Sequence, residues 1–213
     1  MKNLPKPPFL CFVTNRNKTC GRPITEIVKY AIDGGVNIIQ IREKDLNDDE
    51  LFELSFKIKN IIQKQAILII NSNLKIALSC DADGLHLSEN SDLPKTFDKN
   101  QMSLSKSLHS SNINSIENIK SIDLLILGNI YQTSTHPNVK PKGIQIINEL
   151  KNKTKIPYIG IGGINESNIK PIIKNGAHGI AIISAISESK NPKITTKNIY
   201  QKLNEAWKQN EDQ

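Results

Sequence analysis

The chain has 213 residues with a formal net charge of +7, which comes from 28 Lys and Arg against 21 Asp and Glu. Lysines are spread along the sequence and aromatic residues make up only 5%, so the interleaved basic and aromatic pattern of a nucleic-acid-binding protein is missing. No apolar run reaches membrane-spanning length, and we expect no signal peptide in the proline-rich start. The charge suits small phosphorylated ligands.

Cysteine usage indicates the compartment. Cys11, Cys20 and Cys80 are odd in number and lack the C-x-x-C spacing of a metal or redox site. We therefore expect free thiols in a reducing cytoplasm.

In the first half of the chain, short apolar runs alternate with amphipathic segments, as in parallel β/α proteins. A helical face that begins at Ile24 is stopped by Gly34-Gly35, and Asn47 or Asp48 can cap the next helix. The segment 66–70 is apolar at every position, which indicates a strand buried on both faces. The predicted strands are 9–13, 38–42, 66–70 and 84–87, with helices beginning near 24, 48 and 74.

The same alternation continues in the second half. We predict strands at 102–107, 123–127, 157–161 and 179–183, and helices at 116–119, 146–150, 169–173 and 199–207. No Pro/Gly/Ser-rich linker divides the chain, so residues 1–213 are predicted to form one domain, a (β/α)₈ barrel. A doubly wound open sheet is the structural alternative.

Polar residues cluster where the predicted strands end, which is where barrel enzymes carry their chemistry. After the second strand, Arg42 and Lys44 lie two residues apart, so both side chains can point the same way and hold a pyrophosphate. The alternative is an ion pair with Glu43 or with the acidic run 45–50.

A second anion site is predicted after strands seven and eight. Gly162-Gly163 and Ile183-Ser184 follow those strands, and barrels often bind phosphate there through backbone N–H groups. A tight turn capped by Asn165 is the structural alternative.

Two histidines follow or lie within predicted strands. His109 can act in acid-base chemistry, although a lone histidine is more often a structural hydrogen-bonding group. His86 is expected to pack beneath the rim, and Tyr131 and Trp207 are expected to be core or surface anchors.

Four segments resemble the thiamine phosphate synthase family, which also contains the thiazole tautomerases. They are GGVNIIQIREKDL from Gly34, ILIINSNLKIALSCDADGLHL from Ile67, LILGNIYQTSTHP from Leu125, and IPYIGIGGI followed by GAHGIAIISAI. The resemblance implies a barrel that condenses a hydroxymethylpyrimidine pyrophosphate with a thiazole phosphate, giving thiamine phosphate and pyrophosphate.

The resemblance also implies roles for individual residues. Gln40, Arg42 and Lys44 would hold the pyrimidine pyrophosphate, with Asn71 and Ser107 lining the same site. The thiazole phosphate would meet Thr133, Thr135, Gly163, Ile183 and Ser184, and His136 stands where the family has a lysine.

The sequence departs from the synthases at the Mg²⁺ ligands. Ser72 follows Asn71 where the synthases have Asp, and Asp92 lies one place after the second expected carboxylate. Mg²⁺ prefers hard, anionic oxygen ligands, so Mg²⁺ binding is expected to be weakened, with Asp92 as a candidate ligand.

Three functions remain open. The missing carboxylate favours a tautomerase, some of which use a histidine at the position of His109. The Gln40-x-Arg42-Glu43-Lys44 segment favours the synthase, because a tautomerase has no pyrophosphate to hold. A barrel that binds phosphates without turnover is the third reading. The sequence leaves the oligomeric state open.

Overall fold

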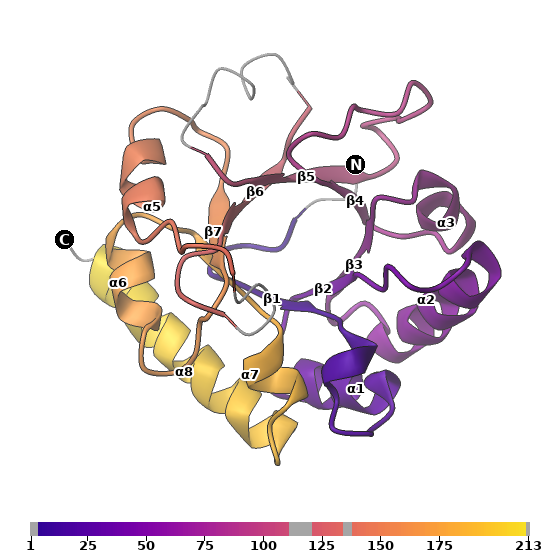
Figure 1. Cartoon of the computed structure of the whole chain (residues 1–213), viewed down its shortest axis with the longest axis horizontal. Helices are drawn as coiled ribbons and strands as arrows, with labels where there is room; N and C mark the ends of the chain where they lie inside the picture. The colour runs from indigo at the N-terminus through magenta and orange to yellow at the C-terminus, as the bar shows by residue number, and fades with distance from the viewer. Residues whose placement is uncertain (1–3, 111–120, 134–137, 212–213) are drawn as a thin grey trace.

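The computed structural model describes residues 4–110, 121–133 and 138–211, and in it eight parallel strands close into a barrel. The strands follow one another around the barrel in sequence order, and β1 (Phe9–Val13) pairs with both β2 (Ile38–Ile41) and β8 (Gly179–Ile182). In Figure 1 the helices lie outside this ring of strands. The barrel prediction is confirmed, and the open-sheet alternative is excluded.

The remaining strands are β3 (Ile67–Asn71), β4 (Gly84–Leu87), β5 (Ser103–Leu108), β6 (Leu124–Gly128) and β7 (Tyr158–Ile161). The helices are η1 (Arg16–Lys18), α1 (Ile24–Asp33), α2 (Asp48–Ile62), α3 (Leu74–Ser79), α5 (Gln145–Leu150), α6 (Ile169–Lys174), α7 (Ser184–Ser187) and α8 (Pro192–Glu211).

Each strand falls within one residue of the bounds expected from its apolar run. Asn47 caps α2 and forms a capping box with Glu50, as its position before the helix suggested. Two helices were missed, η1 and α7, because each is too short to show a helical period. Residues 88–102, where no helix was predicted, connect β4 to β5 without one. The helix predicted at 116–119 lies outside the described residues.

The alternation of side chains along each strand builds two apolar layers. In β1, Phe9, Cys11 and Val13 point into the barrel and join an inner cluster, whereas Leu10 and Phe12 pack against the surrounding helices. Burial raises the pKa of the Cys11 thiol far above its usual value, so this thiol stays protonated inside the barrel. The inner layer closes the barrel beneath the carboxyl ends of the strands.

At the amino end, the strands are tied together in pairs by one recurring contact. The residue just before each even-numbered strand accepts a hydrogen bond from a backbone N–H near the start of the preceding odd-numbered strand. The contacts are Leu10 N to Asn37 Oδ1 (2.9 Å), Leu68 N to Asp83 Oδ2 (2.8 Å), Leu104 N to Asp123 Oδ2 (2.9 Å) and Tyr158 N to His178 Nδ1 (3.4 Å).

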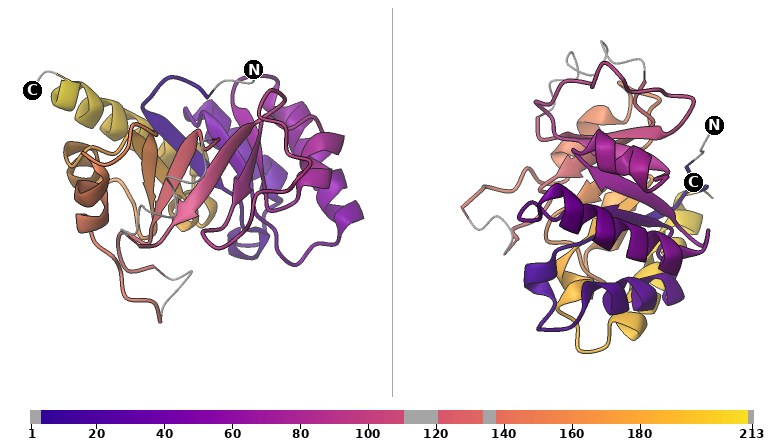
Figure 2. Two further views of the ribbon diagram at one scale, coloured as in Figure 1. Left: turned by 90° about the horizontal axis from the view of Figure 1, so that it is seen from above. Right: turned by 90° about the vertical axis from the view of Figure 1, so that its right-hand side faces the viewer.

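Different segments of the chain lie at the two ends of the barrel. The described parts of the β6–α5 connection, 129–133 and 138–144, project from the carboxyl end (Figure 2). The N-terminal segment lies at the other end, where Leu4 packs against the inner cluster. Within the described ranges, no helix combines the length and apolar character needed to cross a membrane.

Candidate active site

A cavity of about 700 Å³ opens at the carboxyl ends of the strands. It brings together residues at the carboxyl ends of β2 to β8 and in the loops that follow these strands. Asp92 is exposed and is not among the residues that line the cavity, and Thr135 and His136 lie outside the described residues. The predicted site residues that line it are Gln40, Arg42, Lys44, Asn71, Ser107, His109, Thr133, Gly163, Ile183 and Ser184.

The buried carboxylate of Glu43 organises the chain after β2. It accepts two hydrogen bonds from the backbone N–H of Arg16, at 3.0 and 3.2 Å, and one from the Thr14 hydroxyl. The Thr14 oxygen in turn accepts the N–H of Arg42 at 3.1 Å. The Arg16 guanidinium lies 3.6 Å from Glu43 and binds Asp45 at 2.9 Å. The loops after β1 and β2 are thereby locked together.

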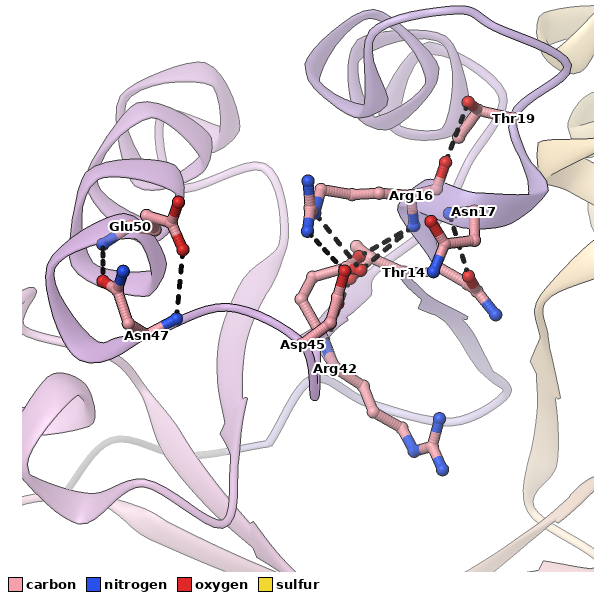
Figure 3. A network of polar contacts seen from close by, with 10 residues as sticks. Thr14, Arg16, Asn17, Thr19, Arg42, Asp45, Asn47 and Glu50 are labelled. Carbon is pink, nitrogen blue, oxygen red and sulfur yellow. Dashed lines mark hydrogen bonds and ion pairs between the residues drawn. The ribbon is translucent and has the colours of Figure 1, made fainter.

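This network leaves the two cations after β2 to the cavity. Glu43 points away from the cavity, while Arg42 and Lys44 on either side of it line the cavity. In Figure 3 the Arg42 guanidinium extends away from Arg16 and Asp45. Within the described residues, neither Arg42 nor Lys44 forms an ion pair, so the structure does not support the alternative pairing with the acidic run. Burial lowers the pKa of Arg42, and the nearby Glu43 partly offsets this.

Across the rim, the turn after β7 is held from two sides. Tyr131 N–H donates to the Gly162 carbonyl at 3.0 Å, and Asn168 Nδ2 donates to the Gly163 carbonyl at 3.0 Å. Both glycines have positive φ, +101° and +66°, which side-chain-bearing residues rarely adopt. A tight turn is therefore present, but Asn165 does not cap α6: its side chain accepts the Ser167 N–H, and α6 begins after Asn168. The turn brings backbone to the cavity wall, where it can approach an anion closely.

Two buried polar atoms of the cavity have no hydrogen-bond partner among the residues that the structure describes. They are Gln40 Oε1, on a residue only 2% exposed, and Ser184 Oγ at the start of α7. A buried acceptor without a donor costs about 1–3 kcal/mol, so a ligand that completes both contacts gains by binding. The first N–H groups of α7, which follow Ile183, lack acceptors within the helix and lie at the same wall.

His109 stands exposed at the rim with one ring nitrogen anchored. Its Nδ1 lies 2.8 Å from the carbonyl oxygen of Gly128. A carbonyl can only accept, so Nδ1 carries the hydrogen and Nε2 is the basic nitrogen of the neutral ring. His109 is thus oriented as an acid-base group would be, with Gly128 fixing its tautomer.

The cavity offers little to a divalent metal. None of the described residues that line it is Asp or Glu, and the described residues contain no cluster of three or more His, Cys, Asp or Glu suited to a metal. Asn71 donates to the Ser72 hydroxyl at 3.1 Å, and Ser72 has φ of 59° with its N–H bound to the His86 carbonyl. The side chains supply neutral oxygens only, which does not fit an Mg²⁺ ion held by protein carboxylates.

Sequence reasoning missed the Glu43 network and the contributions of Ser88 and Gln132 to the cavity wall. The two-residue alternation was a usable signal for Glu43, because a residue between two cavity-facing cations must point the other way. Tyr131 and Trp207 pack against the core as expected, and the Tyr131 hydroxyl also donates to the Asn168 carbonyl at 3.2 Å.

Comparison with known proteins adds independent findings. The model of the thiamine monophosphate synthase family matches residues 10–186. A thiamine-phosphate synthase from Syntrophomonas wolfei is 34% identical over 208 residues, spanning 94% of this chain and 97% of that protein. One from Clostridium acetobutylicum is 35% identical over 192 residues, spanning 87% and 89%.

A solved structure agrees with these sequence matches. The thiamine phosphate pyrophosphorylase from Pyrococcus furiosus superposes with a TM-score of 0.81 at 25% sequence identity. The superposition covers 93% of this chain and 96% of that chain. The similarity therefore extends over the whole barrel.

Proposed function

The chain belongs to the thiamine monophosphate synthase family, and from this premise we propose that it is a thiamine-phosphate synthase. It is a transferase that joins a hydroxymethylpyrimidine pyrophosphate to a thiazole phosphate. The observation that carries the assignment is one cavity with two anion-binding features on different strands: Arg42 and Lys44 after β2, and the Gly163 turn with Ser184 after β7 and β8.

The proposed reaction breaks the bond between the pyrimidine methylene carbon and a pyrophosphate oxygen, and the bonding pair leaves with pyrophosphate. The lone pair of the thiazole ring nitrogen then forms the new C–N bond. Negative charge develops on the leaving group, so Arg42 and Lys44 are placed to stabilise it. Gln40 and Asn71 orient the pyrimidine, while Thr133 and the Gly163 turn hold the thiazole phosphate in line.

Magnesium is part of this proposal as a weakly held cofactor that would add positive charge to the pyrophosphate. The protein would hold Mg²⁺ through the neutral side-chain oxygens of Asn71 and Ser72. Oxygens of the bound pyrophosphate and water would complete the coordination of the ion. Asp92 remains a candidate Mg²⁺ ligand from the sequence, but it does not line the cavity.

Changing Ser72 to Asp is expected to tighten Mg²⁺ binding by about tenfold or more, because an anionic oxygen near the ion is worth about 1–4 kcal/mol. Ser72 has a left-handed backbone, which Asp adopts more readily than most residues. The measurement is calorimetric titration of Mg²⁺ in the presence of pyrophosphate. Ser72→Asn is the matched control, since it keeps the backbone preference without the charge, and equal affinities for the two variants would contradict the prediction.

A second function, thiazole tautomerase, is favoured by a specific observation. His109 is anchored through Nδ1–H to Gly128 and has its basic Nε2 available, in a cavity whose described lining has no carboxylate. That arrangement can move a proton without a metal.

His109→Ala separates the two functions. For the synthase we expect only a modest loss, within about threefold, in thiamine phosphate formation, because the histidine takes no proton in the condensation. A tautomerase would lose about a hundredfold of its rate and would be indifferent to EDTA. Both reactions are measured on wild type and His109→Ala, with and without EDTA. A wild type that isomerises the thiazole phosphate but forms no thiamine phosphate, and that loses about a hundredfold of the isomerisation rate in His109→Ala, would replace the proposed function with the second one.

We also propose a cytoplasmic location, which the three free thiols support. The partners would be small phosphorylated ligands. Residues 1–213 would form a single domain, which is supported by the pairing of the first strand, β1, with the last strand, β8.

A further inference from the structure

A chain of hydrogen bonds runs through the barrel from β4 to the cavity. His86 and Ser105 are register partners on β4 and β5, and Ser107 lies two residues further on the same face. His86 Nδ1 lies 2.9 Å from Ser105 Oγ, and His86 Nε2 lies 2.8 Å from Ser107 Oγ. Ser105 Oγ also donates to the Leu85 carbonyl at 3.4 Å. Both His86 and Ser105 are buried, at 3% and 2% exposed, and His86 lines the cavity together with Ser107, whereas Ser105 does not.

The direction of these hydrogen bonds follows from the one fixed acceptor. The Leu85 carbonyl can only accept, so the single Ser105 hydrogen is directed to it, and Ser105 accepts from His86 Nδ1–H. The neutral ring then has Nε2 as its acceptor, and the Ser107 hydroxyl donates to Nε2. The opposite direction makes one fewer hydrogen bond within the protein, because Ser105 then abandons Leu85.

We propose that Ser105 and His86 are positioning residues that turn the Ser107 hydroxyl into a hydrogen-bond acceptor toward the cavity, so that the site selects a ligand presenting an N–H donor at Ser107. The matching chemistry is the exocyclic amino group of an aminopyrimidine. This ligand assignment rests on the proposed synthase function, whereas the hydrogen-bond direction does not.

The relay requires His86 to stay neutral, since an imidazolium would donate to both serines and reverse Ser107. Burial has the largest effect and, with the nearby Arg42 guanidinium and His109 ring, lowers the pKa of His86 to about 3. The ring therefore keeps an acceptor nitrogen throughout the physiological range.

The direction itself is tested without any substrate. In ¹⁵N-histidine-labelled protein, the His86 ring signals, identified by their loss in His86→Gln, should report the Nδ1–H tautomer. An Nε2–H tautomer would overturn the proposal. This outcome is independent of whether the protein turns over any substrate.

The selectivity is tested by a cycle of two ligands and two proteins. The ligands are an aminopyrimidine pyrophosphate and an analogue with hydrogen in place of the amino group, and their dissociation constants are measured by calorimetry. Wild type should prefer the amino ligand by about tenfold, the effect of one hydrogen bond. Ser105→Ala, which touches no ligand but releases His86 Nδ1, should reduce that preference to about twofold or less.

Ser55→Ala provides the matched control for loss of a buried serine hydroxyl. Ser55 lies on α2, is fully buried, and its hydroxyl has no partner in the described part of the chain. It should keep the wild-type preference for the amino ligand even if both variants lose some stability. An unchanged preference in Ser105→Ala would overturn the role assigned to the relay.

Discussion

Replacing Arg42 with alanine is expected to lower kcat/KM for the pyrimidine pyrophosphate by about 10- to 150-fold. The guanidinium lines the cavity and forms no ion pair within the described residues, so its charge is available to the ligand. A charge-assisted hydrogen bond is worth about 1.5–3 kcal/mol, which converts to that range of rate. Steady-state kinetics with each substrate varied in turn measures the effect, which should fall on the pyrophosphate substrate and spare the KM of the thiazole phosphate.

Lys202→Ala is the control for loss of one positive charge. Lys202 pairs with Glu205 on the exposed face of α8, far from the cavity, and such surface pairs contribute about 0–1 kcal/mol. Its kinetics should match those of wild type. Unchanged kinetics in Arg42→Ala as well would return Arg42 to the role of a surface cation.

Gly163→Ala is expected to weaken thiazole phosphate binding by about tenfold or more and to lower the free energy of unfolding by about 2–4 kcal/mol. A Cβ atom at Gly163 would collide with the Gln132 carbonyl oxygen and approach Tyr131 Cβ to 2.8 Å. The turn must then move away from the loop that follows β6, and its backbone leaves the position proposed for holding the phosphate. Calorimetric binding of the thiazole phosphate and denaturant unfolding measure the two effects.

Gly21→Ala is the control that separates the effect of a steric clash from the effect of placing a side chain at a residue with positive φ. Gly21 has a similar positive φ of +79°, but, its two chain neighbours aside, no atom of the described residues lies within 4 Å of a Cβ placed there. It should lose only about 1 kcal/mol of unfolding free energy and keep phosphate affinity. If Gly163→Ala behaved like Gly21→Ala, the close packing of this turn would have no part in ligand binding.

Much of the fold could be read from periodicity, because buried parallel strands are short, continuously apolar runs. The strand 67–71 illustrates this, as does the cavity-facing direction of Arg42 and Lys44, which follows from two-residue alternation. The positions of the strands and the direction of these side chains follow from local sequence patterns, so they can be predicted without knowledge of long-range contacts.

The contacts that orient the site could not be predicted in the same way. Arg16 is 27 residues from Glu43, and nothing in either segment indicates that a backbone N–H is the partner of that carboxylate. The relay through His86 likewise depends on the register between β4 and β5, which a shift of one residue would abolish. Ser72, which has a left-handed backbone, likewise bonds through its N–H to the carbonyl of His86 on the neighbouring strand β4, and the local sequence does not indicate this partner.

The central claim is that this barrel joins a pyrimidine to a thiazole with loss of pyrophosphate. The most direct measurement is mass spectrometry of the wild-type reaction with both substrates and Mg²⁺, together with a count of the pyrophosphate released. The account predicts thiamine phosphate and pyrophosphate in equal amounts, and neither when one substrate is omitted. Folded protein that binds both substrates yet forms no thiamine phosphate at saturating Mg²⁺ would contradict this claim.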